Sequence, residues 1–227
     1  MLEGENKMEP SKIAGKLFDK VMDYCENERR SNGWHTELLE CVPRYEPDEL
    51  PNFINSYLTN EDNEIKEAIQ NADQNFLESV KKEYEKLWTE EITRELRDYL
   101  GDTLESLLEV IVQDDELCDA CKIRRLKAYD KVLDEFGNAI LQALQNGKPL
   151  SLDELDDWYM KIGDAVYGIR NYDYYYEMGY YDNTYDLLDD NAKLEVLSGL
   201  LDYINSVLWD IEEKYLPELE ALTNNNS

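Results

Sequence analysis

The stretch from residue 61 to residue 100 constrains the fold most, because it contains neither glycine nor proline. Its apolar residues recur every three or four positions, which is the period of one face of an α-helix. They are Ile65, Ile69, Ala72, Phe76, Val80, Tyr84, Trp88, Ile92, Leu96 and Tyr99. The stretch therefore predicts one amphipathic helix about 60 Å long. Gly101 is expected to interrupt it, and Asp102 to cap a new helix behind it.

Helix signals also dominate the rest of the chain. Apolar residues at helical spacing follow Ser11 as far as Gly33. Residues 41–51 contain three prolines and predict a loop. Another helix is expected from about residue 115 to 145, ended by Gly147 as its C-terminal cap.

The last third of the chain continues this pattern. Ser151 and Glu154 have the spacing of a capping box and predict a helix start. A final helix is expected from about Asp190 to Tyr215, ending before Pro217. No segment shows the two-residue period of a strand, so the predicted class is all-α: an irregular bundle of about six to eight helices with one long helix near 61–100.

The predicted organisation has three regions within one compact domain. Residues 1–60 hold the first helix and a proline-containing connection, residues 61–149 a core built on the long helix, and residues 150–227 an acidic, tyrosine-rich helical part. The N-terminus lacks the basic and apolar regions of a secretory signal peptide, which predicts a cytoplasmic protein.

The formal net charge of −29 points to the kind of partner. Residues 150–227 carry 18 of the 52 acidic residues but only 4 of the 23 Lys and Arg residues. Nucleic acid and anionic lipid surfaces would repel such a chain. Hydrophobic residues make up 42% of the sequence and are periodic, which disfavours intrinsic disorder. A basic protein is the expected partner, although a merely soluble acidic helical protein fits the same composition.

One segment, residues 171–190, combines seven tyrosines with acidic residues and contains no base. Tyrosine rings attract Arg and Lys, and carboxylates accept charge-assisted hydrogen bonds from the same groups. We therefore expect a partner-binding site here that continues onto a neighbouring helix. Alternatively, the tyrosines pack into the bundle. The candidate residues are Tyr172, Asp173, Tyr174, Tyr176, Glu177, Tyr181, Asp182, Asp186, Asp153, Asp156 and Asp157.

The charge density resembles that of DNA mimics among phage anti-restriction and anti-CRISPR proteins. Twenty-nine charges correspond to about 14 base pairs of duplex DNA at one charge per 1.7 Å. The resemblance implies an inhibitory binding protein that occupies a basic, nucleic-acid-binding surface of another protein. An immunity protein, an antitoxin or a chaperone for a basic partner would use the same electrostatics with a different arrangement of acids.

One acidic pattern offers an enzymatic alternative. Glu64 and Glu67, followed by Glu95 and Asp98, resemble the magnesium-binding pattern of all-α nucleotide pyrophosphohydrolases. On one uninterrupted helix the two halves would lie about 45 Å apart, so the resemblance would need a kink near residues 71–75. The chain has one histidine, His35, and lacks phosphate-binding and nucleophile motifs. We expect no enzymatic activity.

The four cysteines are Cys25, Cys41, Cys118 and Cys121. Cys118 and Cys121 form a C-x-x-C pair, which also occurs in zinc and redox sites. A second close pair is missing, and both residues fit an apolar stripe with Leu117, Tyr129 and Val132. We therefore expect small core side chains, with zinc and redox chemistry as alternatives, and we expect no metal or other cofactor.

Overall fold

The computed structural model describes residues 8–32, 57–58, 62–168 and 182–225. All regular structure in these ranges is helical, which confirms the predicted all-α class. The chain divides into two compact units, Met1–Ile92 and Thr93–Ser227, which are described separately below. Within the described ranges, no helix has both the length and the apolar character that crossing a membrane requires.

The first unit contains α1 (Pro10–Asn32), α4 (Asn63–Gln70) and the beginning of α5 (Gln74–Gln113). Pro10 occupies the first helical position, where its missing N–H costs no hydrogen bond. The rings of Phe18 and Tyr84 pack edge to face, with centroids 5.5 Å apart. Apolar side chains of all three helices are buried here: Ile13, Ala14, Leu17, Phe18, Val21, Ile65, Ile69, Val80, Tyr84, Trp88 and Ile92.

Residues 71–73 separate α4 from α5, so the prediction of one continuous helix from residue 61 is wrong. The Asn71 side chain donates a hydrogen bond to the Glu67 carbonyl at 2.9 Å, at the end of α4. The Asp73 carboxylate accepts one from the Phe76 N–H at 2.9 Å, at the start of α5. Two polar side chains thus end one helix and begin the next without glycine or proline.

At Gly101 the long helix α5 does not end, contrary to expectation, but continues to Gln113. The Thr103 hydroxyl bonds to the Tyr99 carbonyl within the uninterrupted helix. A methyl group at Gly101 would overlap the ring of Tyr203. Gly101 is therefore a site of close packing against Tyr203 rather than a helix stop.

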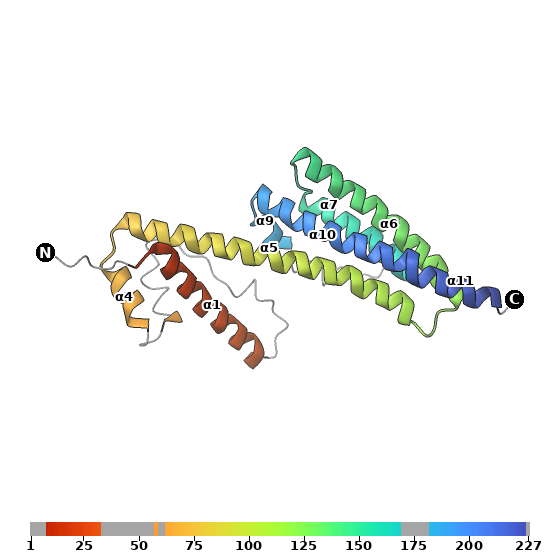
Figure 1. Ribbon diagram of the computed structural model, residues 1–227, viewed down its shortest axis with the longest axis horizontal. Coiled ribbons are helices and arrows are strands. Elements are labelled where there is room, and N and C mark those ends of the chain that lie inside the picture. The colour runs from red at the N-terminus through yellow and green to blue at the C-terminus, as the bar shows by residue number, and fades with distance from the viewer. Residues whose placement is uncertain (1–7, 33–56, 59–61, 169–181, 226–227) are drawn as a thin grey trace. The chain divides into compact units, whose positions relative to one another are not determined.

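In the second unit, α6 (Asp119–Asn146) packs against both α7 (Leu152–Tyr167) and α10 (Asp190–Asp210), as Figure 1 shows. A short helix, α9 (Asp182–Asp186), packs against α7. Two buried tyrosines hold α5 in this bundle. The Tyr129 hydroxyl donates to the Leu104 carbonyl at 2.7 Å, and the Tyr159 hydroxyl to the Leu100 carbonyl at 3.1 Å.

Two predicted helix signals in this unit are confirmed. Gly147 ends α6 with a positive φ of 63°, a conformation that glycine adopts without strain. Ser151 and Glu154 form the predicted capping box at the start of α7, where each side chain bonds to the other residue's backbone N–H. The Ser151 backbone also holds the pKa of Glu154 below its usual value.

The turn between α5 and α6 corrects the interpretation of the C-x-x-C pair. The Asp114 carboxylate accepts the Glu116 N–H at 2.9 Å, so α6 begins at Asp119 rather than near residue 115. Cys118 is the N-cap of α6 and is exposed, whereas Cys121 is half-buried. The N-cap position places Cys118 outside the packed face of the helix, and Cys121 is only half-buried. Neither is therefore a buried core side chain.

Beyond α10 the chain remains helical through η2 (Ile211–Tyr215), a π-helical turn, and α11 (Leu216–Asn225). The helix was predicted to end before Pro217, and this prediction is wrong. Proline cannot donate to the carbonyl four residues earlier and its ring would collide with it. The wider turn accommodates this, with the Leu216 N–H bonded to the Ile211 carbonyl.

Candidate functional site

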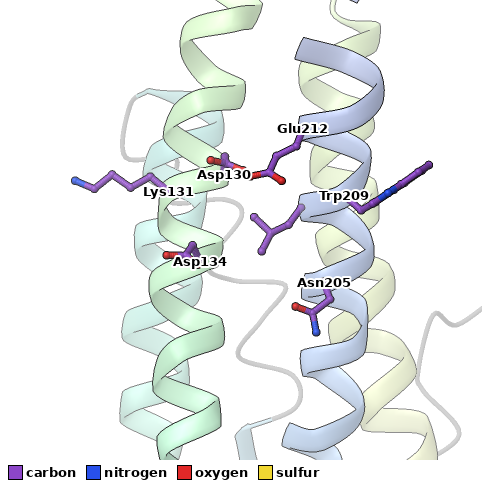
Figure 2. Close-up of a pocket in the computed structure, with 7 residues that line it drawn as sticks. Asp130, Lys131, Asp134, Asn205, Trp209 and Glu212 are labelled. Carbon is purple, nitrogen blue, oxygen red and sulfur yellow. The ribbon is translucent and has the colours of Figure 1, made fainter. Parts of the chain in front are cut away.

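A pocket of about 630 Å³ lies on the second unit where α6 faces the end of α10 and η2. Figure 2 shows this arrangement, with the acidic side chains coming from both sides. The lining residues are Asp130, Lys131, Asp134, Asn205, Leu208, Trp209 and Glu212. All belong to regular helices or to the π-helical turn, so the backbone around the pocket is held by helical hydrogen bonds.

The local sequence explains why these acids meet. Asp130 and Asp134 are four residues apart, so they lie on the same face of α6. Their neighbours Tyr129 and Leu133 are fully buried and fix the rotation of that helix. On the facing side, buried Ile211 anchors the π-helical turn that presents Glu212.

Negative charge is concentrated around Asp130. One of its carboxylate oxygens, Oδ1, is buried and has no hydrogen-bond partner among the described residues. Burial, followed by the charges of Glu212 and Asp134, raises the pKa of Asp130 above its usual value. In Figure 2 the Asp130 and Glu212 side chains point toward each other across the pocket. The folded chain thus holds carboxylates together at an electrostatic cost.

The basic residue in the lining does not relieve this repulsion. Figure 2 shows Lys131 pointing away from the space between Asp130 and Glu212. Its ammonium group lies 3.8 Å from Glu135 on the same helix instead. The exposed indole of Trp209 also points away from α6, and 62% of this residue is accessible to solvent. Among the lining residues, no basic side chain therefore lies between the two carboxylates.

The carboxylates of this pocket come from two facing elements and are hydrogen-bond acceptors. Within the described ranges, no group of three or more His, Cys, Asp or Glu side chains could hold a metal ion. An arginine guanidinium or a lysine ammonium carries several donors and can reach carboxylates on two helices at once. Such a group between Asp130 and Glu212 would offset the repulsion between their charges, although the buried Asp130 Oδ1 is not itself accessible to it.

The site predicted from the tyrosine-rich segment is only partly described. Tyr172, Asp173, Tyr174, Tyr176, Glu177 and Tyr181 lie outside the described residues, as do Cys41 and His35. The side chains of Asp182 and Cys25 are likewise outside what is described.

The remaining predicted residues lie on α7 and α9, two helices that pack against each other. Asp153 and Asp157 are exposed on α7, and Asp156 is half-buried there. Asp186 on α9 is exposed and lies 3.6 Å from the ammonium of Lys193. The structure thus places these acids on adjoining elements, with Asp186 already facing a cation.

Tyr185, one of the seven tyrosines of the segment, belongs to the core. It is 2% exposed, and its hydroxyl donates to the Leu150 carbonyl at 2.8 Å. Burial and nearby carboxylates raise its pKa. For this residue, packing into the bundle, which was the alternative to partner binding, is confirmed.

The acids of the pyrophosphohydrolase pattern are not assembled within one unit. Glu64 and Glu67 lie on α4 in the first unit, although the helix break at residues 71–73 is where a kink was required. Glu95 and Asp98 lie on α5 in the second unit. Asp98 is 2.7 Å from Arg97 and Glu95 is 3.6 Å from Arg94, so both carboxylates face guanidinium groups.

Sequence reasoning missed Asp130, Asp134 and Glu212. The first two follow an ordinary four-residue spacing in a chain with many acids, so the pattern alone does not distinguish them. Pro217 was the available signal for Glu212, because it perturbs the preceding turn.

Comparisons with protein families, with curated proteins and with solved structures found no match to this chain.

Proposed function

We propose that this protein is an acidic binding protein that occupies a basic, nucleic-acid-binding surface of a cytoplasmic partner protein and inhibits it. The single observation that carries the proposal is the uncompensated pair Asp130 and Glu212 on a chain of net charge −29. The pocket receives an Arg or Lys side chain of the partner, while the remaining acids steer the encounter.

Electrostatics favours this function over binding of nucleic acid itself. Phosphates would be repelled by the same carboxylates that attract basic side chains. An inserted guanidinium forms charge-assisted hydrogen bonds with carboxylates, and each such bond contributes about 1.5–3 kcal/mol. Exposed Trp209 beside the pocket adds an aromatic contact of the type enriched among residues that dominate binding energy.

A competition experiment tests the proposal. The protein would be used to capture partners from its native host at low salt, and the basic proteins identified would be purified. We expect each true partner to bind this protein and duplex DNA in a mutually exclusive manner, with an association rate that falls as salt rises. A gel shift of DNA by the protein alone would refute the proposal. Simultaneous binding of protein and DNA by the partner would favour an immunity protein or chaperone instead.

A matched pair of variants tests the pocket. Asp130→Asn combined with Glu212→Gln removes two charges from the pocket, and Asp153→Asn combined with Asp157→Asn removes two exposed charges from α7. We expect the pocket variant to raise the Kd about tenfold or more, and the α7 variant to slow association only modestly. Equal effects would mean that net charge alone drives binding. A larger effect in the α7 variant would place the site at the tyrosine-rich segment.

A further inference from the structure

The start of α6 brings two thiols together. The Cys118 and Cys121 sulfur atoms are 2.6 Å apart, and both cysteines are free. A disulfide bond is about 2.05 Å long, so the two sulfurs need little movement to bond. The Lys122 ammonium donates to the Val112 carbonyl at 2.7 Å and so joins the start of α6 to the end of α5. The pair is therefore held in place on an ordered turn.

We propose that Cys118 and Cys121 form a redox-active dithiol that exchanges with low-molecular-weight disulfides. This activity is independent of cation binding, because Cys118 lies about 18 Å along α6 from Asp130. It is a site for covalent chemistry on a surface that the proposed partner-binding pocket does not use.

The two cysteines have different roles. Cys118 is exposed; its sulfur lies 2.6 Å from the Cys121 sulfur and accepts a hydrogen bond from the Cys121 N–H at 3.2 Å. The neighbouring Cys121 side chain, followed by this backbone N–H, lowers the pKa of Cys118 and favours its thiolate, which is the reactive form. The bond to Cys118, together with burial, raises the pKa of Cys121. An exposed attacking thiolate and a half-buried resolving thiol are the two parts that disulfide exchange requires.

The reaction balances with a dialkyl disulfide such as oxidised glutathione as the oxidant. The Cys118 thiolate attacks one sulfur of that disulfide, forms a mixed disulfide and releases one glutathione thiolate. Cys121 then loses its proton to solvent and attacks the Cys118 sulfur. The internal Cys118–Cys121 disulfide forms and the second glutathione leaves as its thiolate. The small disulfide is reduced by two electrons, and the two cysteines are oxidised by two.

Thiol trapping on the full-length protein tests the proposal. The chain carrying Cys25→Ser and Cys41→Ser would be equilibrated with oxidised and reduced glutathione in a chelator. Free thiols would then be alkylated and the intact mass measured. We expect Cys118 and Cys121 to lose reactivity together, without bound glutathione and with the mass of two hydrogens lost. Dithiothreitol should restore both thiols.

Two further variants make the outcome decisive. With Cys121→Ser, the mixed disulfide cannot be resolved, so we expect one glutathione to accumulate on Cys118. With Cys118→Ser, we expect Cys121 to react more slowly than Cys118 does in the first variant. Independent glutathionylation of both cysteines, or persistence of both thiols under conditions that oxidise free dithiothreitol, would overturn the proposal. Protection of both thiols by zinc alone, reversed by chelator, would assign the pair to a metal site instead.

Discussion

Replacing Gly101 by alanine should destabilise the second unit, although the same change normally stabilises a helix. Alanine is favoured over glycine in a helix interior by about 1 kcal/mol. At Gly101, however, the new methyl group would overlap the ring of Tyr203, including the ring carbon nearest the backbone. Overpacking of this kind costs about 1–3 kcal/mol. The ring is rigid and has to swing away as a whole, so we expect a cost at the upper end of that range and a net loss of about 2 kcal/mol in the free energy of unfolding.

Gly137 on α6 is the matched control in the same unit. A methyl group there would lie 3.4 Å from Ile204 and 3.5 Å from Leu201, which is close to ordinary packing distance. Gly137→Ala should therefore stabilise the protein by about 0.5–1 kcal/mol. Urea unfolding followed by far-UV circular dichroism would measure both variants, and their difference isolates the contact with Tyr203 from the change in helix propensity.

The Tyr203→Ala background completes the cycle. Without the ring, Gly101→Ala should become stabilising by about 1 kcal/mol, because only the helix propensity remains. A Gly101→Ala variant as stable as the wild type would refute the close approach of α5 and α10. A cost that persists in the Tyr203→Ala background would show that another contact, and not the ring, limits the space at Gly101.

Three other perturbations have defined outcomes. Asp73→Ala should lower the free energy of unfolding by about 1 kcal/mol in urea, whereas Asp73→Asn, which keeps an oxygen for the Phe76 N–H, should change it little. Tyr129→Phe should cost about 1 kcal/mol in the same assay through loss of the buried bond to Leu104, and an unchanged midpoint would contradict that bond. The folded-state pKa of Asp130 is raised above 3.8, so the folded state holds this proton more tightly than the unfolded chain does. The wild type should therefore lose stability as pH rises from 3.8 through that folded-state pKa. Asp130→Asn should lack this loss, so parallel stability curves for the two proteins over that window would argue against the buried charge.

The sequence predicted the helical class and several helix ends correctly because those signals are local. Gly147 needs only its own backbone conformation to end α6, and the capping box needs only Ser151 and Glu154. The same local rules failed at Gly101, because a distant ring decides why glycine is there. They also failed at residues 71–73, where side-chain caps end one helix and begin another without a breaker.

Sequence reasoning predicted the fold better than it predicted the candidate pocket. Asp130 matters because one of its oxygens is buried and unpaired, and burial of an atom depends on how α6 and α10 pack. The cysteine pair was recognised as a motif, but its exposure was misjudged. In the sequence, an apolar stripe continues across residue 118, whereas the helix itself begins only at Asp119.

The π-helical turn at Ile211–Tyr215 has a consequence for the tolerance of this helix to insertions and deletions. A π-turn contains one residue more than an α-turn and absorbs it within the turn, so later residues keep nearly the direction that a regular α-helix one residue shorter would give them. The surface that α11 presents to α6, including the 2.7 Å pair of Lys127 with Glu220, therefore depends on this turn being π-helical. If the same residues formed a regular α-helix, α11 would rotate by about 100° and leave its contacts. Deleting one residue within the turn should give a regular helix that keeps those contacts, whereas deleting one residue at the start of α11 should rotate it away.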